Sequence, residues 1–347
     1  MTPFIKIFFI SNVLLGTTMT FMAHHWLLAW AGLEMNSLAM IPIIIKDQHP
    51  RSVEAAVKYF IMQASGGLIL LFAVTVNSFV YNWTISPINY APATIVMVLA
   101  IALKLGMAPF HMWFPEVLQG VNLNTCLILC TWQKLAPFAL AVQAAESLMP
   151  ELLMALGLLS TLVGGWGGLN HLQVRKLLAF SSIAHLGWMF IIIQFSPRLA
   201  TLAMVTYIIM TAAVFIAYKQ VLSTTISSLA LNWTKSPLLV AIITLTIASL
   251  GGLPPLTGFA PKVMILAELA ENGYPVVGLM AALSAQLSLF FYLRLGHAMS
   301  LMLWPNLFHS SILWHLKNKA RFALPALTSA TLMFLPLLPG LILLFPE

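Results

Sequence analysis

The stretch GMAPFHMWFPEV, from Gly106 to Val117, interrupts an apolar run with a glycine and two prolines. A similar stretch, GLPPLTGFAPKV, begins 146 residues later at Gly252. When the two stretches are aligned, four positions have the same residue: Gly106 and Gly252, Pro109 and Pro255, Pro115 and Pro261, and Val117 and Val263. Proline lacks a backbone N–H and clashes with the preceding turn of a helix. The pattern therefore predicts two discontinuous helices, broken near 106–109 and 251–258 by Gly106, Pro109, Gly252, Pro254, Pro255 and Pro261.

The composition of the chain places both breaks inside a membrane. Of the 347 residues, 61% are hydrophobic and 7% are charged, whereas about 25% of an average soluble domain is charged. Apolar runs of the roughly 20 residues that cross a hydrocarbon core of about 30 Å recur from end to end. No hydrophilic block is large enough for a soluble domain, so one all-α membrane domain is predicted over residues 1–347. The basic residues never form a run, which argues against nucleic-acid binding.

Apolar length, turn residues and charges predict eleven transmembrane helices. Their expected limits are 3–22, 24–45, 55–80, 92–119, 124–144, 150–169, 173–195, 199–219, 237–268, 275–296 and 322–345. A second match, YFIMQA at 59–64 against YIIMTA at 207–212, has an offset of 148 residues and agrees with five spans per repeat. Repeat one then covers about 3–144 and repeat two about 150–296, with an extra helix at about 322–345. Because five is odd, matching helices cross in opposite directions, which defines an inverted-topology repeat.

The loop charges predict an orientation in the membrane. With eleven spans, the C-terminal side of the membrane has one basic loop residue, Arg198. The acidic residues on that side are Glu146, Glu151, Glu268, Glu271 and Glu347. Twelve basic residues lie at or near the N-terminal side: Lys6, Lys46, Arg51, Lys58, Arg175, Lys176, Lys219, Lys235, Arg294, Lys317, Lys319 and Arg321. The positive-inside rule then places the N-terminus in the cytoplasm or mitochondrial matrix and the C-terminus across the membrane.

Four ionisable residues lie deep in predicted spans: Glu34, Lys104, Lys134 and Lys262. A lysine at a helix centre costs about 2.5–3.5 kcal/mol on insertion, so a role is expected for each. They could form static bridges that lock helices together, or the lysines could snorkel to the interface. Three lysines against one clear acid count against pairing alone, and Lys104 and Lys134 lie too deep for snorkelling. A relay of groups that exchange protons is the favoured hypothesis.

Histidines could extend such a relay. His111 and His185 lie within predicted spans and could carry protons between lysines. Each is equally well explained as a hydrogen-bonded packing residue. The other histidines lie near span ends or in loops, and no pair is placed as haem or metal ligands, so neither a metal nor a bound cofactor is predicted.

Five segments together give the sequence a close resemblance to a known family. They are HWLLAWAGLEMN, ALKLGMAPFHMWFPEV, TWQKLAPF, GGWGGLNHLQVRKLLAFSSIAHLGW and LGGLPPLTGFAPK. Over its whole length the chain resembles the antiporter-like subunit 2 of mitochondrial NADH:ubiquinone oxidoreductase (complex I) in its animal form. That family is related to subunits of multisubunit cation/proton antiporters. Its wider membership has fourteen helices, and the animal form looks similar to this chain in lacking the first three.

The resemblance implies roles for the ionisable residues. Glu34 matches the carboxylate that partners the first-channel lysine, and Lys104 matches that lysine. Lys134 matches the central connecting lysine, and Lys262 matches the exit-side lysine on the second broken helix. His111 and His185 match positions along the polar axis of the family. By the same resemblance the chain is a subunit of a proton-translocating NADH:ubiquinone reductase and itself holds no redox centre. NADH, FMN, iron-sulfur clusters and ubiquinone would belong to partner subunits.

The resemblance also implies partners and a location. The expected partners are other complex I subunits, especially sibling antiporter-like subunits, and phospholipids. The expected location is the mitochondrial inner membrane, with the N-terminus in the matrix and the C-terminus on the intermembrane-space side.

The residues alone are also consistent with two other functions. A stand-alone secondary cation/proton antiporter would also have inverted repeats and intramembrane charges. A sodium site usually needs carboxylates and carbonyls, whereas this core has three lysines and one clear acid, which favours protons. The other alternative is a structural scaffold, in which the buried charges form static bridges.

Overall fold

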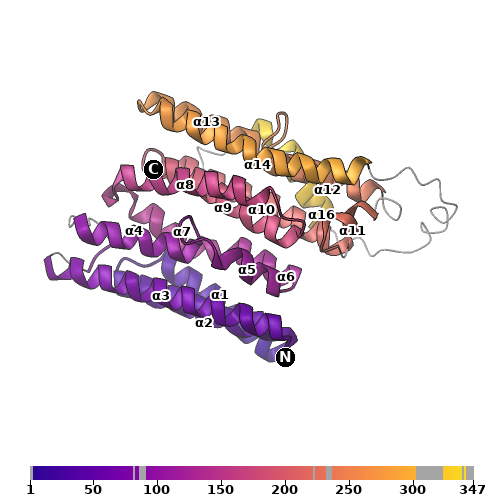
Figure 1. Cartoon of the computed structure of the whole chain (residues 1–347). Helices are drawn as coiled ribbons and strands as arrows, with labels where there is room; N and C mark the ends of the chain where they lie inside the picture. The colour runs from indigo at the N-terminus through magenta and orange to yellow at the C-terminus, as the bar shows by residue number, and fades with distance from the viewer. Residues whose placement is uncertain are drawn as a thin grey trace. The chain divides into compact units, whose positions relative to one another are not determined.

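The computed structural model describes residues 3–80, 83–85, 91–221, 223–231, 237–301, 323–337 and 340. Within these ranges the regular elements are all helices, drawn in Figure 1. The chain divides into two compact units. Unit 1 contains Met1–Ser160 and Met189–Pro197, and unit 2 contains Thr161–Trp188 and Arg198–Glu347.

The helices of unit 1 come from the first half of the chain. They are α1 (Pro3–Phe21), α2 (Trp26–Ile44), α3 (Pro50–Val80), α4 (Ala91–Leu105), α5 (Trp113–Gly120), α6 (Leu123–Cys130), α7 (Trp132–Gln143) and the first part of α8 (Pro150–Gly168). Short 3-10 turns cover Ile45–Asp47 and Ala145–Ser147. Helix α3 packs against α2, α4 and α5, so it is the element around which this unit is built.

The helices of unit 2 follow in the second half of the chain. They are α9 (Val174–Ile192), most of which belongs here, α10 (Pro197–Val221), α11 (Ile226–Leu231), α12 (Pro237–Gly251), α13 (Phe259–Glu271), α14 (Pro275–Leu301) and α16 (Ala323–Met333). A 3-10 turn covers Leu335–Leu337. Helix α14 packs against α11, α12 and α13.

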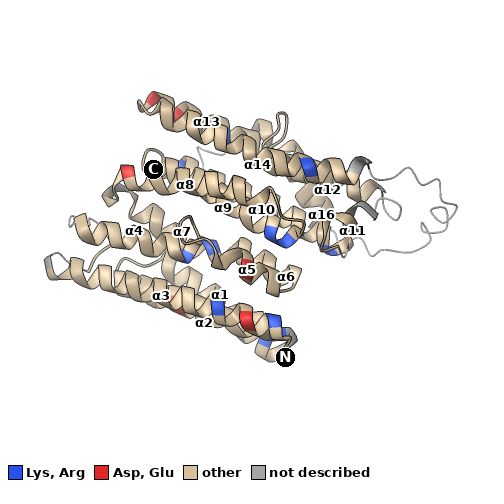
Figure 2. Cartoon of the chain, viewed as in Figure 1, with Lys and Arg blue, Asp and Glu red and all other residues tan. Residues whose placement is uncertain are grey.

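The outer surfaces of these helices suit contact with lipid. Phe79 is 89% exposed, Phe4 84% and Trp166 72%. Charged residues are sparse along the helices (Figure 2). Seven segments of the described residues are long and apolar enough to cross a membrane: Phe4–Phe21, Trp26–Ile44, Pro50–Phe79, Leu123–Gln143, Pro150–Gly168, Pro197–Val221 and Pro275–Met299. Helices α4, α12 and α16 are shorter apolar segments, so the total of eleven spans stays a prediction.

The structure differs from the expected spans at three places. The segment expected at 124–144 is divided into α6 and α7 at Thr131, whose hydroxyl donates to the Leu127 carbonyl over 2.7 Å. The same carbonyl also accepts the backbone N–H of Thr131 over 3.0 Å, and such back-bonding of a threonine hydroxyl often bends a helix. Helix α11 forms in the expected loop 220–236, where six residues are too few to give a periodic pattern. The helix expected at 322–345 ends at Met333, and its last expected residues lie outside the described ones.

The two broken helices share their limits at a constant offset. Helix α4 runs from 91 to 105 and α12 from 237 to 251, a shift of 146 residues at both ends. The helices after the breaks begin at Trp113 and Phe259, again 146 apart. A cis peptide bond precedes Pro109 in the first break and Pro255 in the second.

Helices α4 and α12 also end with the same backbone motif. Gly106 has φ +72° and Gly252 has φ +79°, the left-handed conformation that glycine adopts readily. Each is followed by the paired 6→1 and 5→2 bonds of a Schellman motif. The bonds are Met107 N–H to Ala102 O (2.9 Å), Gly106 N–H to Leu103 O (3.1 Å), Leu253 N–H to Ala248 O (3.3 Å) and Gly252 N–H to Ser249 O (3.0 Å).

A second feature recurs before α2 and α9. An isolated antiparallel bridge joins His25 to Thr84 in unit 1, and another joins Gln173 to Thr225 in unit 2. In each case the first residue of the following helix, Trp26 or Val174, donates its N–H across the bridge. His25 and Gln173 are 148 residues apart, the offset of the tyrosine motifs in the sequence.

Candidate functional site

The central feature of unit 1 is an ion pair between α2 and α4. Lys104, in the last turn of α4, places its Nζ 2.9 Å from Oε1 of Glu34 on α2. The lysine side chain is 1% exposed and the glutamate side chain 19% exposed. The two residues are 70 positions apart, so the packing of α2, α3 and α4 alone brings them together. A charge pair this deep requires close geometry, because desolvation opposes it.

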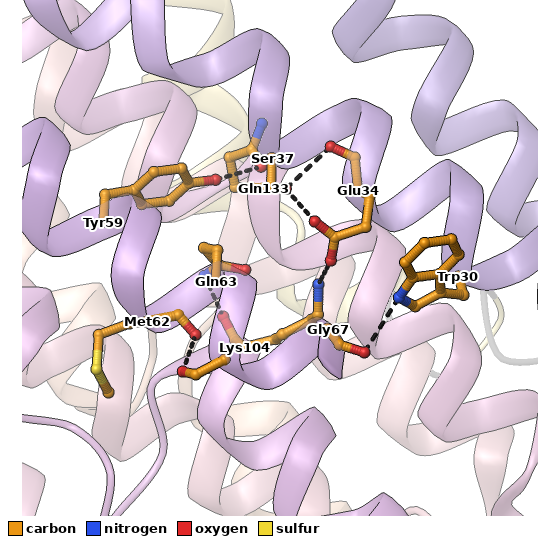
Figure 3. Close-up of polar contacts among 10 residues, drawn as sticks. Trp30, Glu34, Ser37, Tyr59, Met62, Gln63, Gly67, Lys104 and Gln133 are labelled. Carbon is orange, nitrogen blue, oxygen red and sulfur yellow. Dashed lines mark hydrogen bonds and ion pairs between the residues drawn. The ribbon is translucent and has the colours of Figure 1, made fainter. Parts of the chain in front are cut away.

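Two adjacent glycines of α3, Gly66 and Gly67, make room for this pair, and we call them the glycine notch. A Cβ at Gly67 would overlap Oε1 of Glu34 and lie 3.3 Å from Nζ of Lys104. A Cβ at Gly66 would lie 2.9 Å from Cγ of Lys104. The carbonyl of Gly67 accepts a bond of 3.1 Å from Trp30 Nε1, one turn before Glu34 on α2 (Figure 3).

Polar side chains around the pair hold its backbone in place. Gln63, one turn before the glycine notch, donates its Nε2 to the carbonyl of Lys104 over 3.0 Å. Ser37 donates its hydroxyl to the carbonyl of Glu34 over 3.0 Å and lies 3.5 Å from Oε2 of the same residue. Lys104 is also a cation in the last turn of α4, where the helix dipole favours positive charge.

A hydrogen-bonded link connects this region to α7. The hydroxyl of Tyr59 on α3 donates to Oε1 of Gln133 over 3.2 Å, and Nε2 of Gln133 donates to Oδ1 of Asn36 on α2 over 2.8 Å. Gln133 directly precedes Lys134, which is 2% exposed. Nζ of Lys134 lies 5.0 Å from the ring centroid of Phe114, within cation–π range. No sequence signal indicated a site role for Gln133, Asn36 or Tyr59, because uncharged polar residues are common in apolar helices.

His111 and Glu116 belong to the first break. His111 lies between α4 and α5, is 7% exposed, and has its Nδ1 3.2 Å from the carbonyl of Pro109. Glu116 in α5 forms an ion pair of 2.6 Å with Lys58 on α3, and both side chains are substantially exposed. Glu116 coincides with Lys262 in the sequence repeat, but its surface pair gives it different surroundings.

The central feature of unit 2 is Lys262, in the first turn of α13. Its Nζ reaches back across the break and donates to the carbonyl of Gly251, the last residue of α12, over 2.8 Å. A Cβ at the next residue, Gly252, would lie 2.8 Å from this Nζ. His185 on α9 belongs to the same unit and lies with its ring 5.3 Å from the ring of Tyr207.

Each break therefore has a lysine beside it, but the two lysines do not occupy equivalent positions in the repeat. Lys104 belongs to the helix that ends, whereas Lys262 belongs to the helix that follows. Among the described residues, no group of three His, Cys, Asp or Glu side chains could hold a metal ion. The hydrogen-bonded pair of Glu34 and Lys104 joins two ionisable groups between which a proton can pass.

Comparison with known proteins assigns the chain to a family. A family model described as "NADH:quinone oxidoreductase/Mrp antiporter, TM" matches residues 23–288, and one described as "NADH dehydrogenase subunit 2 C-terminus" matches residues 289–342. A protein of Polypterus ornatipinnis named NADH-ubiquinone oxidoreductase chain 2 is 50% identical, over 99% of this chain and 100% of its own length. The chain belongs to the NADH-ubiquinone oxidoreductase chain 2 family. Another member, from Salmo salar, is 52% identical over 98% of this chain and 97% of its own.

Solved structures extend the comparison of this family member. A chain of respiratory complex I from Thermus thermophilus, solved with bound aureothin, matches with a TM-score of 0.84 and 28% identity, over 98% of this chain and 79% of that one. A chain of the Mrp complex from Dietzia sp. DQ12-45-1b matches with a TM-score of 0.74 and 17% identity, over 84% of this chain and 60% of that one. The second likeness concerns the fold alone.

Proposed function

We propose that the chain is a core membrane subunit of respiratory complex I. In this role it translocates protons across the mitochondrial inner membrane, coupled to electron transfer from NADH to ubiquinone. The names of full-length relatives and the match to a complex I chain support this assignment. The chain itself would hold no redox centre, and NADH, FMN, iron-sulfur clusters and ubiquinone would bind to partner subunits. Its partners would include sibling antiporter-like subunits and phospholipids.

We further propose that α1 to α7 and α8 to α14 are two inverted copies of one five-span unit. The common limits of α4 and α12, their shared Schellman ends and the recurring bridges before α2 and α9 support a duplication. Proline and glycine at the breaks are tolerated in a membrane where the freed backbone groups line a protein-buried or hydrated cavity. The positive-inside rule places the N-terminus in the matrix and the C-terminus on the intermembrane-space side.

The proton path would use Glu34, Lys104, Lys134 and Lys262, with His111 and His185 as further carriers. The observation that carries this proposal is the ion pair of Glu34 and Lys104, held by the glycine notch at the end of a broken helix. A charge displaced near this pair changes its energy strongly, because the surroundings of buried charges screen them little. Movement of one charge against 100 mV requires about 2.3 kcal/mol, within the range of such interactions.

The test compares Lys104→Met and Lys134→Met in assembled complex I. Methionine is an unbranched side chain one atom shorter than lysine, so it fills most of the same space and removes the charge. We expect both variants to lose most of the proton pumping per NADH oxidised, measured in sealed vesicles. Lys46→Met, at an exposed lysine of the turn Ile45–Asp47, is the matched control and should pump normally.

Two outcomes would favour the other functions. Assembled variants that pump with unchanged efficiency would indicate a scaffold with static bridges. Ion exchange by the isolated, reconstituted chain would indicate a stand-alone cation/proton antiporter.

A further inference from the structure

Unit 2 contains a cavity of about 720 Å³ between α12 and α14. Residues that line it on α12 include Leu245 and Gly251, and residues on α14 include Leu289, Phe290, Arg294 and His297. Its volume falls within the range of about 300–1,000 Å³ that is typical of sites for small molecules. None of the residues assigned to the proton path lines it.

The cavity combines an apolar wall with a basic end. Leu245 and Phe290 are 47% and 60% exposed, which is a large apolar surface for one site. Arg294 and His297 are three positions apart, so they lie on the same face of α14, and both are exposed. They belong to the last turns of the apolar segment Pro275–Met299, and long basic side chains near the end of a spanning helix can reach the lipid headgroups.

Arg294 is held in position at this end. Its Nη1 donates to the carbonyl of Leu169, the residue after α8, over 2.6 Å. A guanidinium group has five N–H donors in a planar fork, and this bond uses one of them. Such a fork binds phosphate oxygens well, and a fixed guanidinium loses little side-chain entropy on binding. Snorkelling alone would explain why Arg294 reaches the interface, but it would not explain the apolar cavity beside it.

Gly296 shows that part of the lining faces open space. A Cβ built at this glycine meets no atom within 4 Å. Gly296 also has an ordinary helical conformation, since its φ is not positive. A larger side chain can therefore be introduced there without backbone strain, and it would enter the cavity.

We propose that this cavity binds an anionic phospholipid. The phosphate would lie against Arg294 and His297, and an acyl chain would cover Leu245, Leu289 and Phe290. Basic pockets between transmembrane helices are known to bind anionic headgroups. An apolar ligand without a headgroup would leave the basic end unused, and a free phosphate ion would leave the apolar wall exposed.

The lipid would also lie next to the second helix break. Gly251 lines the cavity, and its carbonyl accepts the bond from Nζ of Lys262. A bound acyl chain would therefore restrict movement of the end of α12 on which Lys262 depends. This consequence depends on the proposed proton path, whereas binding of the lipid does not.

The test uses intact complex I, depleted of lipid and then supplied with photoreactive lipids. Two probes carry the same diazirine acyl chain, one on phosphatidylglycerol and the other on phosphatidylcholine. After illumination, labelled peptides of α12 and α14 are quantified by mass spectrometry. We expect phosphatidylglycerol to label these peptides about tenfold more than phosphatidylcholine, which corresponds to about 1.4 kcal/mol of preference.

Two variants separate the headgroup from the acyl chain. Arg294→Gln should abolish the preference for phosphatidylglycerol, and Gly296→Leu should reduce labelling by both probes. Gly278→Ala, on the same helix with ordinary contacts around its Cβ, should change neither. Equal labelling by the two probes in the wild type, or a preference that Arg294→Gln does not change, would overturn the proposal.

Competition in the wild-type complex gives a second test if a variant fails to assemble. Unlabelled phosphatidylglycerol in excess should displace the probe, whereas phosphatidylcholine and inorganic phosphate should not. Displacement by inorganic phosphate alone would indicate a simple anion site and contradict binding of a lipid. Labelling reports lipid binding and does not require proton pumping. The experiment can therefore contradict the lipid site while the proposed proton path still holds, and the reverse.

Discussion

The first and second helix breaks have the same backbone and stabilise their lysines differently. At the first, Lys104 is paired with a carboxylate from another helix across the glycine notch. At the second, Lys262 is bound to the carbonyl that ends α12, and within the described residues no carboxylate lies within ion-pair distance. The first site therefore depends on helix packing, and the second on the conformation of the break itself. A displaced charge would act in opposite directions on the two members of the ion pair and so change the strength of their pairing, whereas at Lys262 it would act on a single ammonium group.

The largest effect should come from Glu34→Gln. Loss of one partner of a buried ion pair typically costs about 3–5 kcal/mol, because the other charge is left uncompensated. We expect less assembled complex and no pumping by what remains, measured by native electrophoresis and by proton uptake into vesicles. Glu151→Gln, at an exposed glutamate, is the control. In the double variant with Lys104→Met, assembly should recover while pumping stays absent. Normal assembly and pumping by Glu34→Gln alone would contradict the importance of the pair.

Gly67→Ala should separate the pair without removing either charge. The added Cβ would overlap Glu34 Oε1, so the carboxylate must leave its position beside Nζ of Lys104. Overpacking of this kind typically costs about 1–3 kcal/mol. We expect a lower denaturation temperature of the complex and weaker pumping. Gly278→Ala, where the new contacts would be ordinary, is the matched control. The glycine notch would have no special role if the two alanine variants behaved alike.

Gly252→Ala and Gly106→Ala should distinguish the two breaks. Both glycines have positive φ, and a left-handed conformation costs other residues about 1–2 kcal/mol. The Cβ at Gly252 would also lie 2.8 Å from Nζ of Lys262, whereas the Cβ at Gly106 would approach Phe114 and Trp113 at 3.3 Å. Both variants should lose similar stability, but only Gly252→Ala should displace the lysine and reduce pumping further. Equal pumping by the two variants would show that the carbonyl contact of Lys262 is unimportant.

Tyr59→Phe tests the link to α7 and should have a smaller effect. The change removes the hydrogen bond to Gln133, which contributes about 0.5–1.5 kcal/mol. Gln133 keeps its bond to Asn36, so α7 should stay in place. We expect slightly lower thermal stability and nearly normal pumping. Gln133→Leu removes both bonds and should reduce pumping more, and the reverse order of effects would contradict the link.

Lys58→Met should have the smallest effect of the series. Lys58 pairs with Glu54 and Glu116 at the surface, where solvent and salt weaken ion pairs. Assembly and pumping should both stay within experimental error of the wild type. A large loss of pumping would mean that Glu116 corresponds to Lys262 in function as well as in sequence position.

Local sequence signals predicted the positions of both breaks and most helices. Gly106, Pro109, Gly252 and Pro255 alter the backbone wherever the chain is folded, so their effect can be read without tertiary structure. The division of α6 from α7 at Thr131 was missed, because threonine occurs in many unbroken helices. The length of the chain and its apolar runs indicated a membrane protein, and the family comparisons agree.

The sequence by itself determined a membrane-embedded chain with two glycine–proline breaks and four ionisable residues within apolar segments, because these follow from local composition and backbone chemistry. Only the tertiary structure decided which groups meet. Glu34 reaches Lys104 because α3 has no side chain at Gly67, and Lys262 finds a carbonyl acceptor because α12 ends at Gly251. Residues tens of positions apart are brought together by helix packing, which depends on the shapes of all the neighbouring side chains and not on any one segment.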